Sequence, residues 1–218
     1  MSNLTPNQQI IANDILKYKT NKFAATLALG GIVFNALYFC MLYCFTTEFF
    51  STWEIGISVV LTLFSLLIIF LASEGIKGYN KKFAIVLIVV AAVQIIRMFG
   101  LPLEAYKHDA AIAAGKAAGD MALTGGYFFA TIKYKTAYAL LLIWLALSAA
   151  CLVASAVIGY INCLKLEKHV KATESGEIDI DVTLRAMDEE DERQAQNVLS
   201  EATVTESEHK LIEEDEHA

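Results

Sequence analysis

The stretch FAIVLIVVAAVQIIRMFGLPL, residues 83–103, decides the fold of this chain. A helix of this length, at about 1.5 Å per residue, crosses a bilayer core of about 30 Å, and the stretch contains a single charged side chain, Arg97. Three more apolar runs of comparable or greater length occupy residues 23–46, 55–73 and 137–163. We therefore expect an all-α, polytopic membrane protein built as a four-helix transmembrane bundle.

The composition agrees with a membrane domain and adds a hydrophilic tail. Hydrophobic residues make up 56% of the chain and charged residues 19%, and the mean hydropathy is +0.48. Residues 1–171 hold 14 basic and 8 acidic side chains, whereas residues 172–218 hold 3 and 16. This asymmetry predicts an amphipathic leader (1–22), a four-span membrane domain (23–163) with an outer loop (104–136), and a flexible tail (164–218), first basic and then acidic.

The lysines next to the runs predict the orientation. Four lysines lie on the side that carries the 104–136 loop: Lys107, Lys116, Lys133 and Lys135. Nine lie on the other side: Lys17, Lys19, Lys22, Lys77, Lys81, Lys82, Lys165, Lys168 and Lys171. Because basic residues are retained on the cytoplasmic side, we expect a multi-pass protein of the cell (plasma) membrane with both termini in the cytoplasm.

A small set of polar residues interrupts the apolar runs and forms the candidate site. Counting the helical rise from the cytoplasmic ends places Asn35, Gln94 and Arg97 at nearly the same depth. On the second run, Ser58, Thr62 and Ser65 follow i, i+4, i+7 spacing, so they line one helix face. We expect these side chains to form an intramembrane polar cluster.

Arg97 allows two interpretations, because a charge inside the membrane must face protein, a water-filled cavity or an interface. In the first, its side chain turns outward to Glu104 or Glu54, and the neutral polar groups only hold helices together. In the second, Arg97 forms an anion or headgroup site in an outward-facing polar cavity. A cavity that reaches Arg97 would favour the second interpretation.

The fourth run carries a packing pattern. Cys151, Ser155, Gly159 and Cys163 recur every four residues and form a stripe of small side chains that lets another backbone approach closely. The stripe predicts helix packing, either within the bundle or between protomers. No histidine lies in any run to complete a metal site with the cysteines.

Enzymatic chemistry has no support in the motifs. The sequence contains no GxSxG, HExxH, Walker loop or dinucleotide fingerprint, so we expect no catalysis, no cofactor and no metal. The net charge of −13 over residues 172–218 repels nucleic acid. A weakly amphipathic helix over 182–200 is instead suited to folding on a basic cytoplasmic protein.

These observations favour a non-catalytic accessory or scaffold subunit in the lipid bilayer, packed with itself or with other membrane subunits. Its acidic tail would recruit a cytoplasmic partner. The alternative is a small oligomeric, uncoupled channel or carrier with Arg97 in its polar cavity.

Overall fold

This computed structural model describes residues 6–45, 50–123, 132–174 and 179–215. Within those ranges all regular secondary structure is helical: α1 (Pro6–Phe45), α2 (Thr52–Lys77), α3 (Lys81–Met98), α4 (Leu101–Ala113), α5 (Tyr134–Glu174) and α6 (Ile180–Asp215). The prediction of an all-helical chain is confirmed, with four helical stretches long and apolar enough to span a membrane: Gln8–Cys44, Thr52–Lys77, Lys81–Ala113 and Tyr134–Thr173. The chain divides into two compact units, one over residues 17–167 and the other made of the two chain ends.

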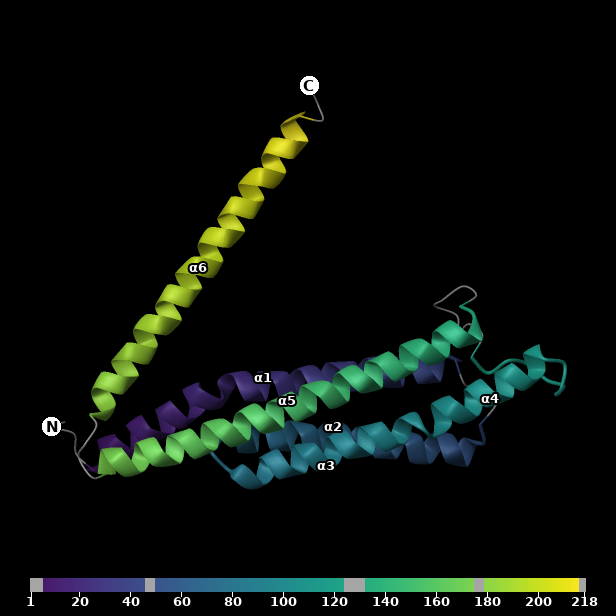
Figure 1. Ribbon diagram of the computed structural model, residues 1–218, viewed down its shortest axis with the longest axis horizontal. Helices are drawn as coiled ribbons and strands as arrows, with labels where there is room; N and C mark the ends of the chain where they lie inside the picture. The colour runs from purple at the N-terminus through teal and green to yellow at the C-terminus, as the bar shows by residue number, and fades with distance from the viewer. Residues whose placement is uncertain (1–5, 46–49, 124–131, 175–178, 216–218) are drawn as a thin grey trace. The chain divides into compact units, whose positions relative to one another are not determined.

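The unit over residues 17–167 is a helical bundle in which α1, α2, α3 and α5 run side by side (Figure 1). Its core consists mainly of small and branched apolar side chains, among them Ala28, Ile69, Leu87 and Leu152. Towards the α4 end, a second cluster around Tyr38, Leu123 and Leu141 takes over the core. Tyr38 of this second cluster also belongs to the candidate site described below.

The outer surface of this unit is apolar, unlike that of a soluble bundle. On α2, Val60 and Phe64 are 65% and 60% exposed, and on α3 Ile96 is 69% exposed. Large exposed apolar patches of this kind are lower in free energy in contact with hydrocarbon than in contact with water. The polar side chains of α2 are the ones that turn inward, since Ser58, Thr62 and Ser65 are its buried residues in that stretch.

Hydroxyl groups of α5 bind backbone carbonyls of α1. Ser155 Oγ donates to the carbonyl of Ala24 over 2.6 Å, and Ser148 Oγ donates to the carbonyl of Gly31 over 2.9 Å. Small residues let the two backbones approach closely enough for these bonds. The first and last spans of the bundle are thus joined directly.

A tight turn connects α2 to α3. Gly75 packs against the ring of Phe83 so closely that a side chain at this position has no room. Asn80 caps α3 by accepting the Lys82 N–H over 3.2 Å. Lys81, at the start of α3, forms an ion pair with Glu167 of α5 and ties the turn to the end of the bundle.

The third apolar run is not one helix, as residues 83–103 predicted, but two. α3 ends at Met98, Phe99 and Gly100 form a turn, and α4 begins at Leu101 and extends to Ala113, into the predicted outer loop. Pro102 explains the break, because it has no N–H to continue the helical bonds of α3 and its ring does not fit the preceding turn of a helix. Residues 124–131 of the predicted loop lie outside the described residues.

Beyond the bundle the helices extend past the predicted boundaries. The predicted leader and first span share one continuous helix, since α1 begins at Pro6. α6 includes the predicted 182–200 segment and continues to Asp215. On α6, Val182 and Val198 are 64% and 67% exposed.

Candidate functional site

Arg97 lies in the last turn of α3 and points between the helices. Its guanidinium donates to Thr62 Oγ1 of α2 over 2.6 Å and to Gln94 Oε1 of its own helix over 3.1 Å. It also donates to Asn35 Oδ1 of α1 over 3.4 Å. The structure therefore brings together four of the six residues of the predicted polar cluster, and they come from three helices.

The two serines of the cluster have other positions. Ser65 Oγ donates to the carbonyl of Leu61 within α2, one turn further along the helix from Thr62. Ser58 is buried, and its carbonyl accepts the Thr62 hydroxyl over 2.8 Å. Because the single hydroxyl proton of Thr62 is used in that bond, its lone pairs are left to accept from Arg97.

The partners of the guanidinium are neutral. Within the residues that the structure describes, no carboxylate forms an ion pair with Arg97, and neither Glu54 nor Glu104 does so. The ring of Tyr38 lies 5.0 Å from the guanidinium carbon, a distance suited to a cation–π interaction. Dipoles and a ring therefore stabilise the charge without neutralising it.

Two amide groups are fixed by this arrangement. Asn35 and Gln94 are both fully buried. A guanidinium has only donors, so each amide must turn its oxygen towards Arg97. The Asn35 Nδ2 and Gln94 Nε2 atoms are then left without a hydrogen-bond partner among the described residues. Since an unmade buried hydrogen bond costs about 1–3 kcal/mol, the cluster orients the arginine at a cost in stability.

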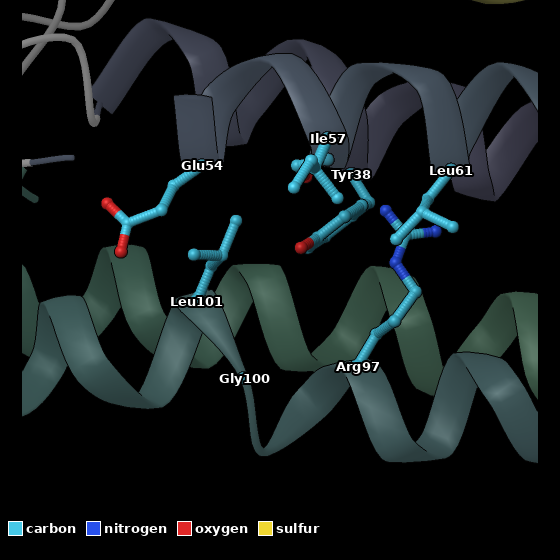
Figure 2. Close-up of a pocket in the computed structure, with 8 residues that line it drawn as sticks. Tyr38, Glu54, Ile57, Leu61, Arg97, Gly100 and Leu101 are labelled. Carbon is cyan, nitrogen blue, oxygen red and sulfur yellow. The ribbon is translucent and has the colours of Figure 1, made fainter. Parts of the chain in front are cut away.

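A cavity of about 260 Å³ reaches Arg97 from the surface of the bundle. Figure 2 shows Arg97 at one end, the carboxylate of Glu54 at the other, and Tyr38 between them. Ile57 and Leu61, which line the cavity from α2, are 44% and 53% exposed, so the cavity opens sideways on the apolar surface. Its remaining lining consists of Ser58, Gly100 and Leu101.

Sequence reasoning missed two features of this site. Tyr38 was not among the predicted residues, although it lies three positions after Asn35 and therefore on the same helix face. Gly100 and Leu101 also line the cavity, at the break between α3 and α4 that the apolar run did not predict. The Gly-Leu-Pro sequence at 100–102 was the available signal for that break.

The predicted stripe on α5 faces the interior of the bundle. Ser155 binds the backbone of α1, and a Cβ on Gly159 would lie 3.0 Å from Ile76 of α2. Asn21 of α1 donates to the Cys163 sulfur over 3.7 Å. A Cβ on Gly30 of α1 would lie 3.9 Å from the Cys151 sulfur. The contacts of the stripe are thus with α1 and α2 of the same chain.

Comparison with protein-family models, curated proteins and solved structures finds no match for this chain.

We predict that Thr62→Val destabilises the protein by about 1–2 kcal/mol, because the substitution removes the nearest acceptor of a buried cation. The matched control is Ser65→Ala on the same face of α2, where the lost hydroxyl binds only its own helix. This control is expected to have a smaller effect than Thr62→Val, because a serine hydroxyl bonded one turn back on its own helix adds little to helix stability. Equilibrium unfolding of both variants in detergent measures the difference, and equal effects would contradict the assigned role of Thr62.

Proposed function

We propose that this chain is a non-catalytic integral membrane protein whose bundle binds an anionic group at Arg97, as the binding element of a small uncoupled channel or carrier. One observation carries the proposal: the guanidinium lines an open cavity and has no carboxylate partner among the described residues. A desolvated cation without a counter-ion gains strongly from an anion that enters its cavity.

Two observations weigh against a purely structural role. Arg97 does not turn outward to Glu54 or Glu104, as the first interpretation expected, but binds Thr62 and Gln94 at the inner end of the cavity. The stripe on α5, which could have joined protomers, is in contact with α1 and α2. Both observations support a binding role for the bundle over a scaffold assembled through that stripe.

We propose that Arg97→Gln weakens the binding of dodecyl phosphate, an anionic amphiphile, by about tenfold or more, because a charge-assisted hydrogen bond is worth about 1.5–3 kcal/mol. Binding is measured by calorimetry with the full-length protein in a neutral maltoside detergent. Arg97→Lys keeps the charge but loses the planar guanidinium, so its affinity for dodecyl phosphate is expected to lie between those of the original chain and Arg97→Gln.

Lys116→Gln is the control, because it removes one positive charge outside the cavity. Circular dichroism of every variant checks that the helices persist. If Arg97→Gln and Lys116→Gln bind dodecyl phosphate as tightly as the original chain, Arg97 is not an anion site.

We further propose that the protein lies in the cell membrane with both termini in the cytoplasm and the cavity near the outer surface. The support is the distribution of lysines, nine on the proposed cytoplasmic side against four on the other. On this orientation the variant Asp188→Cys, in a chain whose four native cysteines are replaced, stays unlabelled by an impermeant maleimide in intact cells. Labelling before the membrane is permeabilised would place residue 188 outside the cell and contradict the proposed orientation.

A second candidate function is supported by α6. This helix is acidic, as in the run Asp188–Glu192, and it exposes Val182 and Val198. An exposed acidic helix with apolar side chains suits recruitment of a basic cytoplasmic protein.

For this second candidate, we expect residues 172–218 on beads to retain a basic protein from cytoplasm and Val182→Ser with Val198→Ser to reduce the yield. A scrambled segment of the same composition is the control. Equal retention by the scrambled segment would leave only non-specific charge attraction.

A further inference from the structure

We infer that the cavity between α2 and the α3–α4 junction takes the headgroup of a zwitterionic phospholipid, with the phosphate at Arg97 and a primary ammonium at Glu54. The inference rests on the proposed anion site and names its ligand class. The juxtaposition that carries it is a cation and an anion at opposite ends of one cavity, each held by neutral groups and neither paired with the other.

The carboxylate of Glu54 is fixed in position by the start of α2. Ser51 donates to Glu54 Oε2 twice, from its backbone N–H over 2.9 Å and from its hydroxyl over 2.8 Å. Ser51 Oγ in turn accepts the Glu54 N–H, which completes a capping box. Among the described residues no hydrogen bond or ion pair uses the second oxygen, Oε1, which can therefore accept from a ligand.

The two charges are too far apart to neutralise each other without a ligand. Arg97 contacts Thr62, and Thr62 follows Glu54 by eight residues, about 12 Å along α2 at about 1.5 Å per residue. Glu54 is exposed, so its attraction to Arg97 is also screened. Thr62 and Gln94 hold the guanidinium at its end of the cavity, and Ser51 holds the carboxylate at the other. A ligand that carries both signs would satisfy both groups.

The order of the groups matches that of a phospholipid in a membrane. Trp53, next to Glu54, is 76% exposed, as expected of an indole at the level of lipid headgroups. Arg97 lies deeper, beside the exposed Leu61. In an aminophospholipid the ammonium is outermost, the phosphate comes next, and the acyl chains follow towards the hydrocarbon. The lateral opening by Leu61 lets those chains remain in the bilayer.

The size and charge of the cavity narrow the ligand class further. A volume of about 260 Å³ lies below the range of about 300–1,000 Å³ typical of sites that enclose a whole drug-sized ligand. It therefore suits a headgroup whose tails stay outside. Glu54 repels a second negative charge. A purely anionic lipid is therefore attracted by Arg97 but repelled by Glu54, which weakens its binding.

The test measures binding of short-chain lipids to the full-length protein in maltoside detergent. Dioctanoyl phosphatidylethanolamine is compared with dioctanoyl phosphatidylglycerol, which lacks the ammonium. It is also compared with soluble phosphoethanolamine, which lacks the acyl tails. We expect the ethanolamine lipid to bind about tenfold more tightly than either. Glu54→Gln, which keeps an acceptor for the Ser51 N–H, is expected to abolish the preference between the two lipids.

Glu104→Gln is the matched control, because it removes an acidic side chain outside the cavity lining. Equal binding of both lipids, unchanged by Glu54→Gln but weakened by Arg97→Gln, would overturn the zwitterionic ligand and leave the anion site intact. Loss of the Arg97 dependence itself would overturn the proposed function. Equal binding of soluble phosphoethanolamine would overturn the membrane origin of the ligand.

Discussion

The bond between Arg97 and Thr62 is the interaction on which the site depends. It brings a charged side chain of α3 against α2, and through the neighbouring Asn35 it includes α1 as well. A charge in the interior of a membrane domain is expensive, and its position is set by the few groups that solvate it. Here those groups are neutral, so they position the guanidinium without neutralising its charge.

The break between α3 and α4 gives this interaction its access to the surface. Gly100 stands in the turn and adds no side chain to the cavity wall, and Leu101, the first residue of α4, forms part of that wall. The turn thus forms one side of the cavity that opens beside Arg97.

Much of this arrangement can be predicted from the sequence. The four apolar runs imply helices because a bilayer forces the backbone to satisfy its own hydrogen bonds. The helical rise alone places Asn35, Gln94 and Arg97 at one depth, and the structure finds all three in contact. The Ser51–Glu54 capping box was not predicted, although a serine followed three positions later by a glutamate is its sequence signature.

The direction in which Arg97 points could not be predicted. Periodicity fixes the depth of a residue and its angle around its own helix, but the choice between Thr62 and an outer carboxylate depends on how neighbouring helices are rotated. The start of α4 at Leu101, inside the predicted third span, was missed for a different reason. Hydropathy records an apolar run without registering that Pro102 cannot donate a hydrogen bond.

The serine bonds from α5 to α1 have a consequence for the order of assembly. Ser155 and Ala24 are separated by 131 residues, and Ser148 and Gly31 by 117. The first helix is therefore synthesised long before α5. The carbonyls of Ala24 and Gly31 can accept these hydrogen bonds only after the last span has been made. Closure of the bundle is consequently a late event of biogenesis, and a chain truncated before α5 cannot complete it.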